Sequence, residues 1–295
     1  MTGRKVIVTV APTGGLANKA DNPNLPTQPH EIAADVLRCY NAGASIAALH
    51  ARRQDDEATC DPAVYRETNT LIRARCDIVI NNSTGGGVNG DLLTWNESGY
   101  HEVSWAQRLR GLDGGADMCT LDAMTCFASV GDREVLLATS PSRGRELAEG
   151  MRAKEIKPEW EAFGPTHLAQ EIAALIGGGY DSPPYFVNLV FGLDRVFQGA
   201  LPYSPKNLQL MVDLLPQQSL FTVSAVGEPD TDALVHALLL GGHVRVGLED
   251  NLRDAGGKPT TNLAAVQRIV RIVRELGMEP ATAAEAREML GLERL

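Results

Sequence analysis

The sequence predicts an α/β fold, a (β/α)8 TIM barrel that forms a single domain over residues 1–295. Short β-branched runs alternate with helical stretches along the whole chain, which favours parallel strands joined by right-handed crossovers. The chain has room for eight such strand–helix units, and eight units at this length favour a closed barrel. The glycine-containing stretch 13–19 does not lead directly into a helix, as the phosphate-binding turn of a dinucleotide fold does.

Two helices of the first four units begin with clear start signals. Pro29 precedes the helix over 30–43, and Asp61 and Pro62 open the helix over 61–76 as an N-cap followed by a proline. The expected strands of this half are 5–12, 45–51, 77–84 and 116–123, and the expected helices are 30–43, 61–76, 101–112 and 142–155.

The second half repeats the alternation and adds one helix. The strand over 157–164 has the weakest pattern, because Pro158 and two glutamates lower its β propensity. The expected strands are 157–164, 184–192, 219–227 and 243–249, and the expected helices are 166–179, 204–216, 230–242 and 262–277. An extra C-terminal helix over 282–290 closes the chain.

Composition and charge exclude several classes of protein. The 27 basic and 37 acidic residues give a net charge of −10, and no basic run is present, which argues against a nucleic-acid surface. No apolar run is long enough to cross a membrane, and the short N-terminal run predicts a first strand and not a signal peptide. The five cysteines have no tight paired spacing, so we expect reduced thiols in a cytoplasmic protein.

The stretch 241–250 alternates between polar and apolar residues, as a strand with two different faces does. The apolar face suits the helix layer and consists of Val244, Val246 and Leu248. The other face points into the barrel and consists of His243, Arg245, Gly247 and Glu249. Asp250 follows at the C-terminal end, where active sites of this fold gather. Buried charges are costly unless they are paired, so this row needs partners.

Other predicted strands end in polar side chains on the same inward side. They are His50 after the second strand, Ser83 and Thr84 after the third, Thr120 and Asp122 in the fourth, and Glu159 and Glu161 in the fifth. The hydroxyls of Ser83 and Thr84 suit a planar carboxylate. Polar groups that converge from several strands predict an enzyme site. Simpler interpretations stay open, with His50 as a core histidine and Arg245 in a structural ion pair; His243, at the opposite end, is assigned a structural role.

Six motifs along the chain resemble those of the β-keto acid cleavage enzyme family (3-keto-5-aminohexanoate cleavage enzyme-like). The most specific is GGHVRVGLEDNL at 241–252. The others follow in the same order as in the family and are PNLPTQPHEIA (23–33), NAGASIAALHAR (41–52), INNSTGG (80–86), MCTLD (118–122) and IKPEWEAF (156–163).

The resemblance implies a zinc-dependent (β/α)8 barrel that exchanges acyl groups between a small β-keto acid and acetyl-CoA, giving acetoacetate and a new acyl-CoA. It implies a set of site residues, with His50 and Glu249 as metal ligands, Arg245 and Asp250 as the catalytic pair, Ser83 on the substrate carboxylate and Thr120 near the site. A ketone oxygen on zinc would be polarised and its enolate stabilised. The resemblance also implies a homo-oligomer, commonly a tetramer.

The sequence departs from the family pattern at four positions. Ala48 stands where the first histidine of an HxH motif is expected, Leu16 near an expected glutamate, Arg53 at an expected aspartate, and Glu228 where a basic residue is common. His50 and Glu249 then provide two protein ligands, fewer than the three usual for catalytic zinc. The sequence therefore predicts a weakened divalent-metal site, with Asp122 or Asp250 as a replacement oxygen donor.

Two other hypotheses stand beside a β-keto acid cleavage acyltransferase. One is a divergent barrel lyase or isomerase that acts on a small carboxylate through Ser83, Arg245 and Asp250. The other is a non-catalytic carboxylate-binding homologue. Metal content separates the acyltransferase from these two, and turnover of any β-keto acid separates the lyase or isomerase from the non-catalytic homologue.

Overall fold

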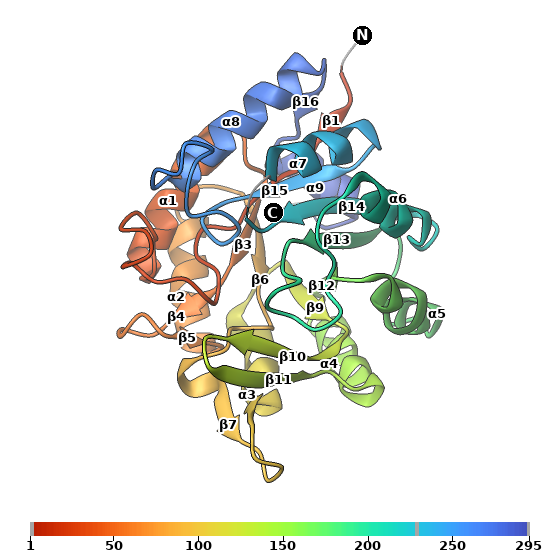
Figure 1. Ribbon diagram of the computed structural model, residues 1–295. Helices are drawn as coiled ribbons and strands as arrows, with labels where there is room; N and C mark the ends of the chain where they lie inside the picture. Colours follow the sequence, from red (N-terminus) through yellow and green to blue (C-terminus); the bar gives the residue numbers. More distant parts are fainter. Residues whose placement is uncertain (1–2, 228–229, 294–295) are drawn as a thin grey trace.

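Eight parallel strands close into a barrel in the computed structural model, which describes residues 3–227 and 230–293 (Figure 1). In order around the barrel these strands are β2 (Val8–Val10), β3 (Ile46–Leu49), β6 (Val79–Asn82), β9 (Met118–Asp122), β12 (Lys157–Ala162), β13 (Tyr185–Phe191), β14 (Ser219–Ala225) and β15 (His243–Val246). Strand β15 pairs again with β2 and completes the ring. The closed barrel confirms the predicted fold class.

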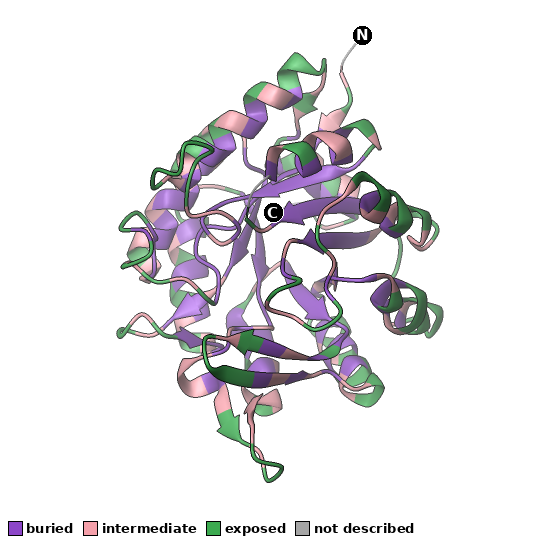
Figure 2. Cartoon of the chain, in the orientation of Figure 1, coloured by how far each residue is buried: buried purple, intermediate pink, exposed green. Residues whose placement is uncertain are grey.

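Helices follow the strands and lie around the outside of the barrel (Figure 1). They are α1 (Pro29–Asn41), α2 (Pro62–Arg73), α3 (Trp105–Arg110), α4 (Pro141–Ala153), α5 (Ala173–Gly177), α6 (Pro205–Asp213), α7 (Asp230–Leu239), α8 (Asn262–Glu275) and the extra helix α9 (Ala283–Leu290). The predicted helix over 166–179 begins as a π-helix at His167–Ile172. Figure 2 shows buried strands inside and helices whose outer faces are exposed.

Strand β15 has the two faces that its alternation predicts. Val244 and Val246 are fully or almost fully buried and pack in one core cluster with Val266 and Ile269 of α8. Arg245 points to the other side, where it lines a cavity inside the barrel mouth. The strand thus contributes to the core with one face and to the cavity with the other.

The N-terminal end of the barrel is filled by an apolar cluster. It contains Ile46, Val79, Met118 and Phe186 from the barrel strands, Ile7 from between β1 and β2, and Ala286 and Leu290 from α9. His243 lies at this end, where its Nδ1 accepts a hydrogen bond from the backbone N–H of Ile7 at 3.1 Å. Burial lowers the pKa of His243 to about 3. It is therefore a neutral histidine with a structural contact, as its place in the strand predicts.

A small mixed sheet near the barrel mouth is missing from the sequence prediction. Strand β10 (Thr125–Val130) pairs with β11 (Arg133–Ala138), β11 with β8 (His101–Val103), and β8 with β7 (Leu93–Trp95). The predicted helix over 101–112 is wrong at its start, because 101–103 is a strand and α3 is short. Such short strands carry little periodic signal and form by pairing with one another.

Strand β15 ends at Val246, earlier than the predicted end at Glu249. A Cβ on Gly247 would lie 2.1 Å from the carbonyl oxygen of Ala11, so only glycine allows the chain to turn at this point. Glu249 and Asp250 consequently belong to the turn after the strand.

Short strand pairs flank the barrel, namely β1 (Lys5–Val6) with β16 (Glu279–Pro280) and β4 (Ala51–Arg52) with β5 (Ala58–Thr59). The predicted strand over 5–12 is thus divided into β1 and β2. All five cysteines are free and four of them are buried, as the sequence predicts. Across residues 3–227 and 230–293, no helix has the length and apolar character needed to cross a membrane. Glu228 lies outside the described residues.

Candidate active site

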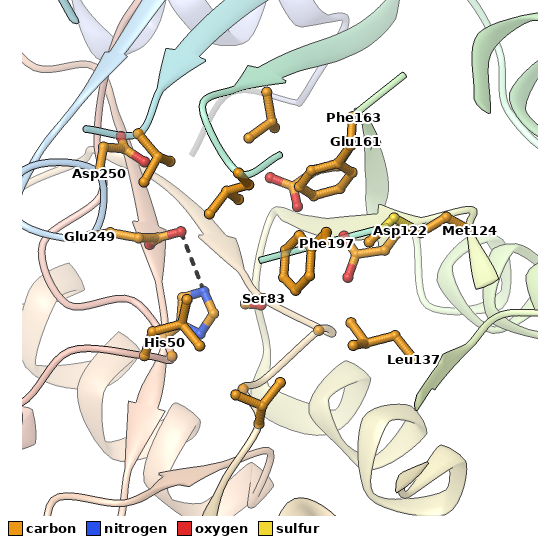
Figure 3. A pocket seen from close by; sticks show the side chains of 18 of the residues that line it. His50, Ser83, Asp122, Met124, Leu137, Glu161, Phe163, Phe197, Glu249 and Asp250 are labelled. Carbon is orange, nitrogen blue, oxygen red and sulfur yellow. Dashed lines mark ion pairs between the residues drawn. The ribbon is translucent and has the colours of Figure 1, made fainter. Parts of the chain in front are cut away.

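A cavity of about 110 Å³ lies at the C-terminal ends of the barrel strands (Figure 3). Five of the predicted site residues line it, namely His50, Ser83, Arg245, Glu249 and Asp250. Apolar side chains form much of the rest of the wall, and they include Met124, Leu137, Phe163 and Phe197. The cavity therefore combines a charged side with an apolar side.

The guanidinium of Arg245 is held by three carboxylates. Its Nε and Nη2 donate to the two oxygens of Asp250 at 3.2 and 2.6 Å, and its Nη1 donates to Glu161 at 3.3 Å. Its Nη2 also lies 3.1 Å from Oε1 of Glu249. Burial alone would lower the pKa of Arg245, but Asp250, Glu249 and Glu161 hold it well above its usual value. Burial of the Arg245 guanidinium, which would be unfavourable for an isolated charge, is thus offset by three carboxylates.

The two neighbouring acids of the turn differ in their proton affinity. Burial raises the pKa of Asp250 to about 6, although the charge of Arg245 opposes the shift. Burial also acts to raise the pKa of Glu249, but Arg245 and His50 outweigh it and lower the value to about 2. Glu249 is consequently ionised near neutral pH, while Asp250 lies in the range where a general base works well.

His50 follows β3 and points at Glu249. Its Nδ1 lies 2.7 Å from the carbonyl oxygen of Gly86, which can only accept, so Nδ1 carries the proton in this contact. Its Nε2 lies 3.6 Å from Oε1 of Glu249. Gly86 has a φ of +71°, and a Cβ there would collide with Leu92 and Cys60, so glycine is required to present this carbonyl.

The three predicted hydroxyl residues occupy different places. Ser83 lines the cavity, and its Oγ accepts a hydrogen bond from the N–H of Gly86 at 3.2 Å. Thr84 and Thr120 lie behind it, bonded to each other: the Thr84 N–H donates to Thr120 Oγ1 at 3.1 Å, and Thr84 Oγ1 donates to the Thr120 carbonyl at 2.7 Å. Of the three, Ser83 is the one that faces the cavity, and contact with substrate stays a prediction for all of them.

Two further carboxylates from the inward-facing set that the sequence predicts, Glu161 and Asp122, also line the cavity, although the family resemblance assigns neither of them a role. Glu161 binds Arg245 and also accepts from Asn188 at 2.9 Å, and Asp122 lies at the end of β9. The alternation within their strands places both side chains on inward faces, and this is the sequence pattern that predicts them near the site. The pairing of Glu161 with Arg245 could not be found from the pattern, because 84 residues separate them.

The residues fit a divalent metal only in part. His50 presents its Nε2 toward Glu249 with its Nδ1 anchored on a backbone carbonyl, the usual arrangement for a metal-binding histidine. Oε2 of Glu249 is buried and has no hydrogen-bond partner in the described part of the chain. Ala48 adds no donor, and no group of three histidine, cysteine or acidic side chains suited to a metal occurs among the described residues. Two oriented donors are therefore present where three are usual.

Residues 5–292 match the model of the family described as beta-keto acid cleavage enzyme. The chain is 33% identical over 295 residues to the 3-keto-5-aminohexanoate cleavage enzyme of Fusobacterium nucleatum, with 98% of this chain and 99% of that protein covered. It is 32% identical over 305 residues to the 3-dehydrocarnitine:acetyl-CoA trimethylamine transferase of Rhizobium meliloti, with 98% and 97% covered.

The apo structure of ObcA has a similar fold, with a TM-score of 0.73 and 20% identity. The likeness covers 92% of this chain and 66% of that one, and at this identity it supports the fold alone. The family match spans nearly the whole chain and confirms the resemblance carried by the motifs. The chain belongs to the β-keto acid cleavage enzyme family.

Proposed function

We propose that this chain exchanges acyl groups between a small β-keto acid and acetyl-CoA, giving acetoacetate and a new acyl-CoA. The observation that carries the proposal is the pairing of Arg245 with Asp250 at the barrel mouth, beside His50 and Glu249. Family membership supports the cleavage of a β-keto acid. Acetyl-CoA as co-substrate is supported by the Rhizobium meliloti relative, whose name contains it.

In this proposal Asp250 accepts a proton from the substrate, and Arg245 stabilises the negative charge that results. Arg245 holds both oxygens of Asp250, so this carboxylate is positioned to accept a proton from the carbon beside the ketone. The guanidinium also faces the negative charge that develops when that proton leaves. Ser83 binds the substrate carboxylate, while Thr84 and Thr120 complete this subsite by holding the loop that carries it.

We further propose a weakened divalent-metal site at His50 and Glu249, with zinc as the metal that the family resemblance implies. The Nε2 of His50, which faces Glu249, and the unpartnered Oε2 of Glu249 support it. A bound metal would supply Lewis-acid polarisation of the ketone. Loss of a residue that supports a metal ligand typically lowers metal affinity roughly 10–100-fold. The imidazole that Ala48 lacks would be a ligand itself, so its loss lowers the affinity by at least as much.

The test is an assay of both products with purified protein, a short β-keto acid and acetyl-CoA. Acetoacetate and the new acyl-CoA should form in equal amounts and only when both substrates are present. Turnover without acetyl-CoA would instead support the lyase or isomerase, and binding without turnover would support the non-catalytic homologue. Arg245→Ala should abolish binding of the β-keto acid, and the unpaired acids should lower stability by about 3–5 kcal/mol.

A further inference from the structure

We propose that the cavity selects a β-keto acid whose tail is an uncharged hydrocarbon chain. The inference rests on the proposed function, because it takes the reacting end of the keto acid to lie at His50, Arg245 and Asp250. It adds the chemical class of the tail, and with it the class of acyl group that is transferred to coenzyme A.

The side of the cavity that faces His50 and Glu249 is mostly apolar (Figure 3). Its labelled apolar side chains are Met124, Leu137, Phe163 and Phe197. Since the reacting end of the substrate is held on the charged side, its tail extends toward these side chains.

The apolar wall is part of a hydrophobic cluster that is distinct from the cluster of the barrel core. Its members include Met124, Leu137, Phe163, Val190 and Leu193, and Phe197 packs against them. All six of these side chains also line the cavity, so the cluster is open on that side. A hydrocarbon tail would close the cluster by covering apolar surface, and the gain in free energy grows with the area covered.

Leu16, in the loop after β2, adds to the apolar lining. Its side chain is 43% exposed although the residue lines the cavity. Of the large hydrophobic residues that are exposed in residues 3–227 and 230–293, Leu16 is the one that lies at this cavity. An apolar ligand that fills the cavity would cover part of this exposed surface.

Asp122, a carboxylate on the apolar side, is already matched by other side chains. Its Oδ2 lies 3.7 Å from Nη2 of Arg108, whose side chain is 1% exposed. Burial, and then the charge of Asp122, raise the pKa of Glu161 well above its usual value, which favours one proton shared between the two carboxyl groups. Asp122 therefore leaves no unmatched charge for the tail of a substrate.

A charged tail would consequently be unfavourable in this cavity. A cationic tail would lose its water and would have to compete with Arg108 for Asp122. An anionic tail would lie among the carboxyl groups that line the cavity, which belong to Asp122, Glu161, Glu249 and Asp250. A hydrocarbon tail needs no polar partner and gains from contact with the apolar wall.

Two experiments on the parent protein test the inference, and the first varies the length of the tail. 3-Oxopentanoate and 3-oxohexanoate differ by one methylene group, and their affinities are measured by calorimetry without acetyl-CoA. 3-Oxohexanoate should bind about fourfold more tightly, which is the gain expected from burying one methylene group. Equal or weaker binding of 3-oxohexanoate, or no binding of either acid, would overturn the inference.

The second experiment varies the charge of the tail at constant length. 3-Oxohexanoate, 5-amino-3-oxohexanoate and 3-oxoadipate have uncharged, cationic and anionic tails. The uncharged acid should bind at least about tenfold more tightly than either charged acid, and its kcat/KM for acetoacetate formation should be the highest. With acetyl-CoA it should give acetoacetate and butanoyl-CoA in equal amounts, which accounts for all carbons of both substrates. A charged acid that binds as tightly, or that is turned over in preference, contradicts the inference.

Variants assign the preference to the apolar wall. Phe197→Ala removes a half-buried ring from the wall, so it should weaken binding of 3-oxohexanoate at least about fivefold and reduce its preference over the charged acids. Phe197→Leu keeps hydrocarbon surface and should retain most of the preference. Phe127→Ala is the matched control, because Phe127 lies on β10, packs against Tyr100 and does not line the cavity.

Unchanged affinity and preference in Phe197→Ala, or an equal loss in Phe127→Ala, would mean that the apolar wall does not select the tail. The two experiments on the parent protein decide the inference even if a variant does not fold.

Failure of the proposed function has a different signature. If 3-oxohexanoate binds preferentially but none of the acids yields acetoacetate, the acyl-transfer reaction is wrong and the inference about the tail stands. If 5-amino-3-oxohexanoate or 3-oxoadipate yields acetoacetate in preference to 3-oxohexanoate, the inference is wrong and the proposed function stands.

Discussion

A guanidinium inside a barrel strand is tolerated only where its charge and its donors are matched. Arg245 meets this condition through Asp250 and Glu249 from its own turn and Glu161 from a distant strand. The same ion pairs lower the pKa of Glu249 and fix the orientation of Asp250. At the scale of single residues, one cation therefore organises the acids of the cavity.

Ala48→His restores the imidazole that the family pattern expects. If the site keeps its geometry, the variant should bind zinc at least about tenfold more tightly than the parent, because the new imidazole is a third protein ligand beside His50 and Glu249. Zinc affinity is measured by competition titration, and metal content after purification without chelators. A parent that already holds one zinc per chain, with no gain in the variant, would contradict the weakened site.

His243 makes stability depend on pH. Burial and the charge of Arg4 lower its folded pKa to about 3, whereas the unfolded chain has a value of about 6.5. The unfolded state therefore binds a proton first as pH falls below 6.5, and stability is lost progressively down to the folded pKa. By about pH 5, protonation of this histidine in the unfolded chain should have lowered the free energy of unfolding by about 2 kcal/mol.

His243→Gln isolates that contribution, because the other titrating groups are the same in both proteins. Denaturant unfolding of parent and variant is compared at about pH 7.5 and pH 5. The parent should lose about 2 kcal/mol more than the variant on acidification. Parallel losses in the two proteins would mean that His243 is not held neutral in the folded state.

Elements outside the strand–helix repeat occupy the two ends of the barrel. Helix α9 packs its Leu290 into the apolar cluster at the N-terminal end. The β10–β11 hairpin packs at the other end, where Met124 and Leu137 line the cavity and share a buried cluster with Phe163. The repeat builds the barrel, while these additions close one end and shape the cavity at the other.

Leu290→Ala measures the contribution of α9. Leu290 is fully buried, so its truncation should lower the free energy of unfolding by about 2–4 kcal/mol. Catalytic constants of the folded protein should not change, because the cavity lies at the opposite end. Leu276→Ala is the matched control, since Leu276 is 37% exposed at the end of α8 and its loss should change stability by less than about 0.5 kcal/mol. Similar losses in both variants would contradict the closing role of α9.

For the whole molecule, the expectation from the family resemblance is a homo-oligomer, commonly a tetramer. Exposed leucines on α6 and α7, Leu210 and Leu239, offer apolar contact surface. Light scattering at micromolar concentration should give four times the mass of one chain. Leu239→Glu should lower this mass if α7 contributes to the interface, and a parent that scatters as a single chain would contradict the expectation.

Much of the molecule follows from the sequence by itself. The alternation of strands and helices determines the barrel, and the period of two within each strand determines which residues face inward. Because parallel strands all end at one mouth, this pattern was enough to bring together His50, Ser83, Arg245, Glu249 and Asp250. These are local properties of the chain combined with one rule of topology.

Tertiary structure alone decided the partners and the shape of the cavity. Glu161 meets Arg245 across 84 residues, and the β10–β11 hairpin, which the sequence pattern misses, supplies apolar wall opposite His50. The physical reason is that pairing, burial and charge balance depend on distances between segments that are far apart in the chain, and periodicity carries no information about those distances.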